Sequence, residues 1–402
     1  MFPAWIVAIA VILVLQTTSA YLSRLIPIAS PAFMAEFGWD QSWIGYLSAA
    51  NIVGALFVLF ACVGLIQRMG SVFALQLSLV LGAASLILFH VPSLAVALLA
   101  SALIGISNGT ANPAGAEVLQ RYTPDARRNF VFSIKQAGVP LGGVVAGLTI
   151  PPLIETFGWR SALLIAAAGT LAATALMLPF RARIDGPRER ASRSRMSLAD
   201  LAVPLRSLTS APGLLRVSIV GAVLSIAQSC WFTFAVTYLV VGHGLSLGVA
   251  GVVFAVMQAA GVAGRIAMGW IADHVASSTA TLAIVAVLSA AVTIAFGLFR
   301  PDWPAWSLMA LAAAAGATVS GWNGVQIAEV ARRSPRGLVG ETAAGSVILV
   351  FLSNMIAPVV FAAFVAATGR FDVAFVIAGA CSLVCLPLLW GVDARPDQTL
   401  PS

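Results

Sequence analysis

The chain has 402 residues, of which 60% are hydrophobic and 9% are charged, and its mean hydropathy is +0.98. This composition excludes an ordinary soluble domain and predicts an all-α protein of membrane-spanning helices in a lipid bilayer. The net charge of +7 would suggest nucleic acid in a soluble protein. Here the basic residues sort by side of the membrane, so we expect no nucleic-acid partner.

Turn residues and charges divide the sequence into apolar runs of about 20 residues or more, each long enough to cross a hydrocarbon core of about 30 Å. Twelve spans are expected, at 4–29, 41–66, 72–90, 94–118, 130–155, 160–180, 213–241, 246–272, 277–299, 303–330, 338–367 and 371–391. The first run is too long for the apolar core of a secretory signal and lacks a basic leader. We therefore expect it to be a retained span.

Arginine placement predicts the orientation, because positively charged loops stay cytoplasmic. With the N-terminus inside, the opposite side holds only Arg160, Arg300 and Arg370. The cytoplasmic side then holds a larger group that includes Arg68, Arg121, Arg127, Arg128, Arg332, Arg333, Arg336 and Arg395. Both termini are therefore expected in the cytoplasm of a bacterial-type inner membrane.

A basic segment with several Ser and Pro residues splits the chain. We expect a six-helix bundle at 1–180, an Arg-rich cytoplasmic linker at 181–212, a second six-helix bundle at 213–391 and a cytoplasmic tail at 392–402. The charge run indicates topology first, and contact with anionic lipid is the alternative.

The two halves resemble each other. A shift of about 211 residues lays Gly105 and Asn112 near Gly316 and Asn323, as expected for an internal repeat. Two pseudo-symmetric bundles predict a binding cavity between them near the bilayer midplane, opened alternately to each side.

The loop after the eighth run carries Gly269 and Asp273 in the spacing Gly-x-x-x-Asp, followed by His274. The loop after the second run keeps Arg68 and Gly70 but has Gln67 in place of the acid. With these loops and its twelve runs, the whole chain resembles the major facilitator superfamily of secondary transporters. The resemblance implies that Arg68, Gly70, Gly269 and Asp273 form a conformational latch, which the loss of the first acid weakens.

Three cations remain inside apolar runs: Arg24, Lys135 and Arg265. Arg265 is the deepest, about 12 Å from Asp273 at 1.5 Å of rise per residue. A charge in this position costs several kcal/mol unless it faces water or a partner. The alternative is that the side chains extend to the headgroups or bind a carbonyl.

No deep carboxylate is available in the linear map to neutralise these cations, so we expect an anionic small-molecule substrate. A guanidinium group binds a carboxylate, phosphate or sulfonate through two parallel hydrogen bonds. A cation in the first run with an arginine in the eighth also resembles the monocarboxylate and oxalate transporter branches, which implies an organic anion.

Polar side chains on other runs are expected to complete substrate binding, with helix-to-helix hydrogen bonding as the alternative. These candidates are Asn112, Gln228, Trp322, Asn323 and Gln326.

For coupling, the candidate proton carriers are Glu117, Glu329 and Glu341, which all fall at helix ends. We expect a monomeric transporter without cofactor or metal, coupled to protons or another ion or working by exchange. A drug or metabolite efflux porter of the same fold is the first alternative. A membrane sensor or enzyme built on the fold is the second, and no catalytic dyad supports it.

Overall fold

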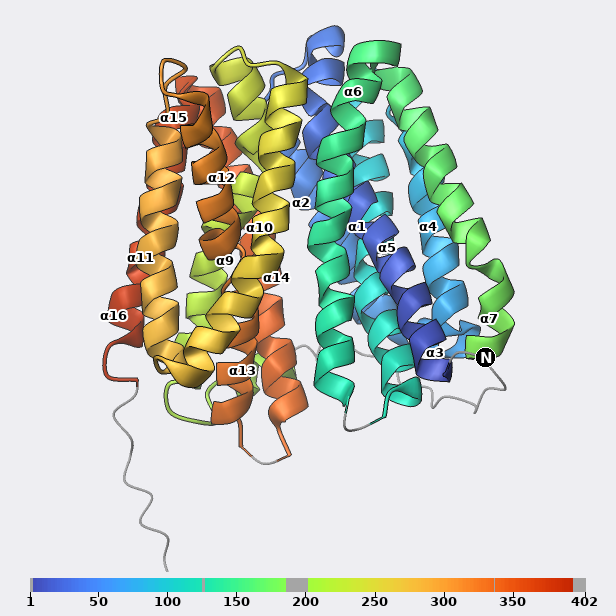
Figure 1. The fold of residues 1–402 in the computed structure, drawn as a ribbon, viewed down its shortest axis with the longest axis vertical. Helices are drawn as coiled ribbons and strands as arrows, with labels where there is room; N and C mark the ends of the chain where they lie inside the picture. The colour runs from blue at the N-terminus through green and yellow to red at the C-terminus, as the bar shows by residue number, and fades with distance from the viewer. Residues whose placement is uncertain (1–2, 125–126, 186–201, 336, 393–402) are drawn as a thin grey trace, which may run out of the picture. The chain divides into compact units, whose positions relative to one another are not determined.

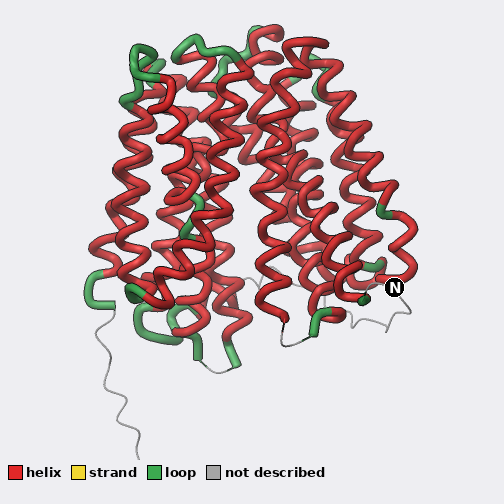
Figure 2. The backbone as a smooth tube through the Cα atoms, in the orientation of Figure 1, coloured by secondary structure: helices red, strands yellow, loops and turns green. Residues whose placement is uncertain are grey.

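The computed structural model of the chain describes residues 3–124, 127–185, 202–335 and 337–392, and every regular element among them is a helix (Figure 2). Within these ranges, 11 helices are long and apolar enough to cross a membrane, judged by length and composition. The predicted class of all-α membrane protein therefore agrees with the structure, whereas the predicted number of twelve spans stays a prediction.

The first part of the chain forms eight elements (Figure 1). They are α1 (Ala4–Phe37), α2 (Trp43–Phe57), the π-helix η1 (Val58–Cys62), α3 (Val63–Met69), α4 (Ser71–Leu88), α5 (Leu94–Tyr122), α6 (Arg128–Leu176) and α7 (Leu178–Asp185).

The later part begins with a short helix and continues with longer ones. Its elements are α8 (Ala202–Ser207), α9 (Leu214–Thr237), the π-helix η4 (Tyr238–Gly242), α10 (Leu247–His274), α11 (Ser278–Gly297), α12 (Ala305–Val319), α13 (Asn323–Arg333), α14 (Val339–Thr368), α15 (Phe371–Cys381), the 3₁₀ helix η5 (Ser382–Val384) and α16 (Cys385–Leu389).

The difference in span number arises in α6, which covers two of the predicted runs. This helix has 49 residues, far more than the roughly 20 that cross a bilayer core. Gly158 interrupts it with a backbone φ of 77° and ψ of 158°, a conformation that residues with a side chain rarely adopt. The helical hydrogen bonding continues on both sides of this kink.

The predicted run 303–330 is also not one helix. α12 ends at Val319 and α13 begins at Asn323, so Ser320, Gly321 and Trp322 are not helical. A Ser-Gly pair is a common place for a helix to kink, because glycine weakens the helix and serine offers it competing hydrogen bonds. At the break the Ser320 carbonyl accepts hydrogen bonds from side chains in the middle of an apolar segment.

The chain folds as two compact units. The first unit comprises Met1–Met196, Phe232–Ala259 and Pro358–Ala367, and the second comprises Ser197–Trp231, Ala260–Ala357 and Thr368–Ser402. Parts of α9, α10 and α14 therefore belong to the first unit. Of the predicted linker and tail, residues 186–201 and 393–402 lie outside the described residues.

Close backbone contacts hold the first unit together. A Cβ atom added at Gly54 of α2 would lie 1.9 Å from the carbonyl oxygen of Ala102, and one added at Gly105 of α5 would lie 1.9 Å from that of Asn51. Small residues allow this approach of neighbouring membrane helices. Glycine also allows α10 to approach α6, because a Cβ atom added at Gly147 would lie 2.6 Å from the Gly251 carbonyl oxygen.

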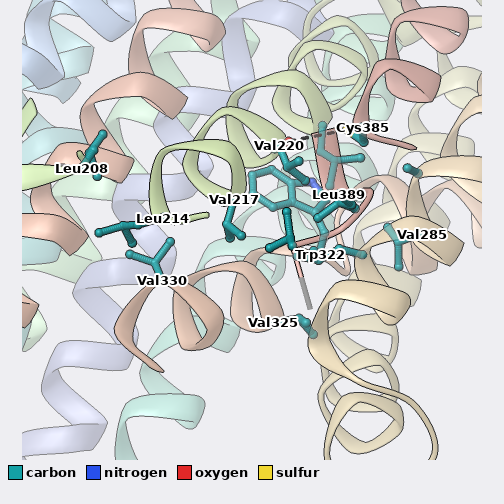
Figure 3. Close-up of a cluster of buried hydrophobic side chains, with 14 residues drawn as sticks. Leu208, Leu214, Val217, Val220, Val285, Trp322, Val325, Val330, Cys385 and Leu389 are labelled. Carbon is teal, nitrogen blue, oxygen red and sulfur yellow. Dashed lines mark hydrogen bonds between the residues drawn. The ribbon is translucent and has the colours of Figure 1, made fainter. Parts of the chain in front are cut away.

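Buried apolar side chains form the core of the second unit, and Figure 3 shows one cluster of them. Trp322 lies in this cluster with Val217 and Val220 of α9 and Leu389 of α16. The cluster fixes the break between α12 and α13 against α9, and so holds the non-helical segment in one position.

Candidate functional site

Arg265 lies on α10 beside the break in the α12–α13 segment. Its Nε donates a hydrogen bond to the backbone carbonyl of Ser320 at 3.2 Å, and Asn323 Nδ2 donates to the same oxygen at 3.2 Å. The break thus brings together two of the predicted substrate-binding residues. No carboxylate of the described residues lies within 4.0 Å of the Arg265 nitrogens.

A guanidinium group has five N–H donors, and the bond to Ser320 uses only the one on Nε. No hydrogen bond from the two Nη groups of Arg265 to a described residue is present. These groups form the planar fork that binds two oxygens of a carboxylate or sulfonate. The arrangement can therefore hold an anion against a fixed cation.

Two other predicted residues of the same segment are bound within the second unit. Trp322 is 1% exposed, and its indole N–H donates to the Val319 carbonyl at 2.9 Å. Gln326 is also 1% exposed and donates to Ser346 Oγ at 2.8 Å and to the Val217 carbonyl at 3.3 Å. The structure places both in helix packing, and Gln228 is buried on α9.

Lys135 of α6 and Asn112 of α5, both predicted for the site, contact each other in the first unit. Lys135 is 4% exposed, and its Nζ donates to Asn112 Oδ1 at 3.1 Å and to the Asn112 carbonyl at 3.4 Å. Among the described residues its acceptors are neutral oxygens and no carboxylate forms an ion pair with it. In the described part of the chain, no carboxylate therefore compensates a positive charge on Lys135.

Arg24 lies on α1 and is half-buried. Its Cζ is 3.9 Å from the centroid of the Phe232 ring on α9, a distance at which the ring face attracts the cation. Both residues belong to the first unit. The aromatic ring supports the guanidinium and gives it an apolar neighbour.

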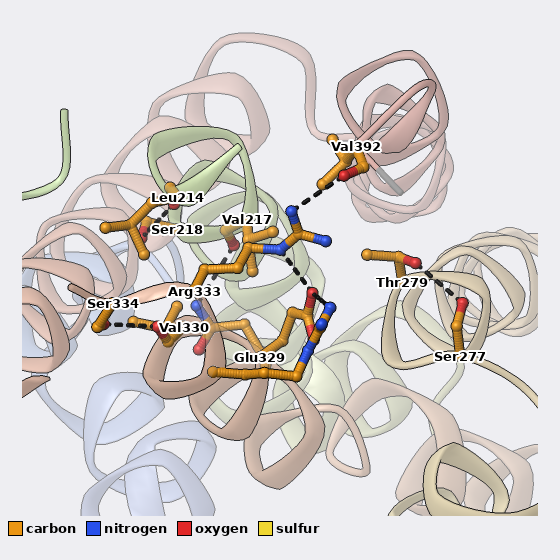
Figure 4. A network of polar contacts seen from close by, with 12 residues as sticks. Leu214, Val217, Ser218, Ser277, Thr279, Glu329, Val330, Arg333, Ser334 and Val392 are labelled. Atoms are coloured by element: carbon orange, nitrogen blue, oxygen red, sulfur yellow. Dashed lines mark hydrogen bonds and ion pairs between the residues drawn. The ribbon is translucent and has the colours of Figure 1, made fainter. Parts of the chain in front are cut away.

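The candidate proton carriers differ in their surroundings. Glu329 is 0% exposed and accepts hydrogen bonds from Arg332 and Arg333, as Figure 4 shows. Glu117 accepts a hydrogen bond from Ser71 Oγ at 2.8 Å. Glu341 is exposed in the first turn of α14.

The predicted latch residues lie at helix ends. Arg68 and Asp273 are exposed, and Gly269 has no atom within 4 Å of an added Cβ. Gly70 joins α3 to α4 with a φ of 98°.

Asp185 is a residue of this region that sequence reasoning missed. It is buried at the end of α7, where its carboxylate accepts hydrogen bonds from the backbone N–H groups of Val72 and Phe73 at 3.0 and 3.1 Å. A carboxylate is stabilised at the N-terminus of a helix, here α4. The sequence signal was an acid directly before Gly186-Pro187.

A metal site is not formed by His, Cys, Asp or Glu side chains in the part of the chain that the structure describes.

The sequence profile of the Major Facilitator Superfamily matches residues 7–350. The chain belongs to this family, as the loop motif around Gly269 and Asp273 predicted. The family and the relatives described next are transporters rather than enzymes.

Three curated relatives illustrate the similarity. The chain is 33% identical over 187 residues to the uncharacterized MFS-type transporter Rv2994 of Mycobacterium tuberculosis, which is 46% of this chain and 40% of that protein. It is 26% identical over 273 residues to the 4-hydroxybenzoate transporter PcaK of Pseudomonas aeruginosa, 61% of each chain. It is 24% identical over 405 residues to the probable sulfoacetate transporter SauU of Cupriavidus necator, 94% of this chain and 93% of that one. The chain thus spans less than two thirds of the length of the first two relatives.

Among solved structures, a bacterial homolog of the human lysosomal transporter Spinster, in an inward-facing and occupied conformation, has a TM-score of 0.76. The sequences are 16% identical, and the match covers 96% of each chain. At this identity the likeness shows the fold alone.

Proposed function

We propose that this chain is a secondary active transporter that moves a small organic anion of the carboxylate type across a bacterial plasma membrane by alternating access. The observation that carries the proposal is Arg265, fixed by its Nε to the Ser320 carbonyl and without a carboxylate partner among the described residues. A cation inside an apolar helix is costly unless it serves binding or transport. An anionic substrate would neutralise it for part of the cycle.

The positive charges of Lys135 and Arg24 also favour a negatively charged substrate. The acceptors of Lys135 among the described residues are neutral oxygens, and Arg24 lies over an aromatic ring. Positive charge in a binding region raises the local concentration of anions. We assign Arg265 the direct contact with the substrate and keep Lys135 and Arg24 as candidate substrate-binding residues.

The relatives' names agree with an anion. PcaK is named for 4-hydroxybenzoate and SauU for sulfoacetate, and both compounds carry a carboxylate at neutral pH. These substrates are those of the relatives, and they support a carboxylate for this chain rather than a neutral drug.

For the topology, we propose twelve spans in two six-helix halves, 1–180 and 213–391, with both termini in the cytoplasm. The kink at Gly158 would then divide α6 into the fifth and sixth spans. Coupling to protons, to another ion or to exchange is part of the proposal, with Glu117, Glu329 and Glu341 as the candidate proton carriers.

Ligand-induced thermal stabilisation of the purified protein tests the proposal. Each carboxylate or sulfonate would be compared with its neutral amide, which keeps shape but removes the charge. A bound ligand at 100 times its Kd stabilises a protein by about 2.7 kcal/mol, so a cognate anion raises the melting temperature measurably. Stabilisation by neutral or cationic compounds, with none by anions, would instead indicate an efflux porter.

A further inference from the structure

Four side chains of the first unit form a series from a cation to an amide. The guanidinium of Arg24 lies over the Phe232 ring at 3.9 Å. The Phe232 and Phe254 rings meet edge to face with centroids 6.4 Å apart. Gln258 lies four residues after Phe254 on α10, on the same face of the helix. The series therefore contains a positive end, an apolar middle and a polar end.

Gln258 is buried with an unused hydrogen-bond donor. Its side chain is 3% exposed, and its Nε2 has no hydrogen-bond partner among the described residues. Leaving a buried amide donor unpaired costs free energy, and the cost is greater where no water can replace the partner. A chain that keeps glutamine here, inside an apolar helix, offers the donor to something that the protein itself does not supply.

Gly143 of α6 makes room for this amide. A Cβ atom at position 143 would lie 2.4 Å from Gln258 Nε2 and 2.6 Å from its Cδ. A side chain on residue 143 would therefore displace the amide. The glycine and the glutamine form one structural feature.

A second buried amide faces the same helix. Gln16 of α1 is 1% exposed, its Oε1 has no hydrogen-bond partner among the described residues, and its Cγ lies 3.0 Å from a Cβ added at Gly138. Gly138 and Gly143 are about 7.5 Å apart along α6 at 1.5 Å of rise per residue. Five residues turn a helix by about 140° net, so Gln16 and Gln258 pack on different faces of α6.

We propose that Gln258 determines substrate specificity by donating a hydrogen bond to a second oxygen of the substrate, remote from its carboxylate. The substrate class is an aromatic carboxylate with a hydroxyl group at the far end of the ring. Phe232 and Phe254 contact the ring, and Arg24 attracts the carboxylate. This inference rests on the proposed transport of an organic anion, because it names the substrate class of the same transporter.

Gln258 lies about one helical turn beyond Phe254 along α10, so the amide donor follows the aromatic rings on the same face of the helix.

Two probes of matched size test the role of Gln258. 4-Hydroxybenzoate and 4-methylbenzoate differ in one hydroxyl, which the second compound replaces by a methyl group of similar volume. Affinity of the purified full-length protein for each is measured by calorimetry, for the wild type and for Gln258→Leu. The wild type is expected to prefer 4-hydroxybenzoate by about tenfold, the value of one neutral hydrogen bond in a site that excludes water. Gln258→Leu is expected to remove this preference and to leave the affinity for 4-methylbenzoate within about twofold, since only the hydroxyl contact is lost.

Two further variants separate specificity from folding. Gly143→Ala is expected to reduce the preference as Gln258→Leu does, because the added methyl group displaces the amide. Gln76→Leu is the control, since Gln76 is another buried amide of the same unit whose Nε2 donates to the Thr174 carbonyl. This control is expected to keep the preference.

The outcomes distinguish this inference from the proposed function. If Gln258→Leu lowers the affinity for both probes equally, Gln258 has a packing role and the inference is overturned. Binding of aliphatic anions that depends on Arg265, without binding of either aromatic probe, would overturn the inference and retain anion transport. Binding of no anion at all would overturn both.

Discussion

The guanidinium of Arg265 and the backbone carbonyl of Ser320 are joined by a hydrogen bond of 3.2 Å. The bond exists because the helix is interrupted between Val319 and Asn323, where a backbone carbonyl can accept side-chain donors. In membrane transporters, such breaks are tolerated where the backbone lines a cavity or binds a ligand. The cation is therefore positioned through the backbone, without an acidic partner among the described residues.

The contact between Lys135 and Asn112 predicts a charge effect. Asn112→Asp would place a carboxylate about where Oδ1 now lies, 3.1 Å from the Lys135 Nζ. The new ion pair is expected to raise the melting temperature and to lower anion uptake by about tenfold, because a neighbouring opposite charge favours and neutralises the ammonium. Uptake into proteoliposomes and thermal unfolding measure the two effects.

Asn112→Ala is the matched variant, because it removes the same side-chain acceptor and adds no charge. It is expected to lower uptake less than Asn112→Asp. If the two variants transport equally well while only the aspartate raises the melting temperature, the charge of Lys135 does not act on the substrate.

Replacement of the buried carboxylate of Glu329 is expected to lower the stability of the protein. Glu329→Gln leaves Arg333, which is 14% exposed, without its ion pair and is expected to destabilise the protein by about 3 kcal/mol. Thermal unfolding measures this loss, and uptake at several pH values measures coupling. Unchanged stability together with lost pH dependence would identify Glu329 as a proton carrier instead.

The close approach of α2 and α5 predicts that Gly105 tolerates no side chain. Gly105→Ala would bring a methyl group against the Asn51 backbone, which cannot rotate away, and is expected to cost about 3 kcal/mol, the upper end for overpacking. Gly169→Ala is the control, because no atom lies within 4 Å of a Cβ at that position of α6. Alanine there is expected to be neutral or slightly stabilising, since it favours the helix. Equal thermal stability of the two variants would show that α2 and α5 do not pack in close backbone contact at Gly105.

The proposed topology predicts opposite accessibility of two exposed positions. Phe157 is 59% exposed beside the Gly158 kink, and Val275 is 67% exposed after α10. In a variant without native cysteines, Phe157→Cys is expected to react with a membrane-impermeant maleimide in intact cells. Val275→Cys is expected to react only after permeabilisation. Reaction of Cys at 275 in intact cells would show that the orientation is opposite to the one proposed. If Cys at 157 reacts in neither condition, the Gly158 kink does not lie at the membrane surface.

The helical fold and the position of the cations could be predicted from the sequence. Apolar runs of span length leave few choices of fold, and a charge inside such a run is visible without a structure. Lys135 and Asn112 were both singled out, although their contact across 23 positions depends on how α5 and α6 pack. The sequence could not show which acceptor each cation has.

Three features required the structure. The break at Ser320 follows from a Ser-Gly pair that also occurs in unbroken helices, so the sequence alone predicted one run. Gln258 was overlooked because one amide within an apolar run is most often a helix-to-helix contact. Trp322 and Gln326 were predicted to share a helical face, with Asn323 beside them, but both are buried against α9 around Val217. Burial of a side chain is a property of the packed unit.

The measurement that tests the central claim most directly is anion uptake by Arg265→Gln in proteoliposomes, beside Arg216→Gln as a control. Arg216 is an exposed arginine near the start of α9, so its replacement removes the same charge without touching the site. Arg265→Gln is expected to lower uptake of the cognate anion by at least 100-fold, since a hydrogen-bonded charge pair contributes roughly 3 kcal/mol, while Arg216→Gln retains uptake. Saturable uptake that Arg265→Gln leaves unchanged would contradict the assignment of Arg265 to the substrate.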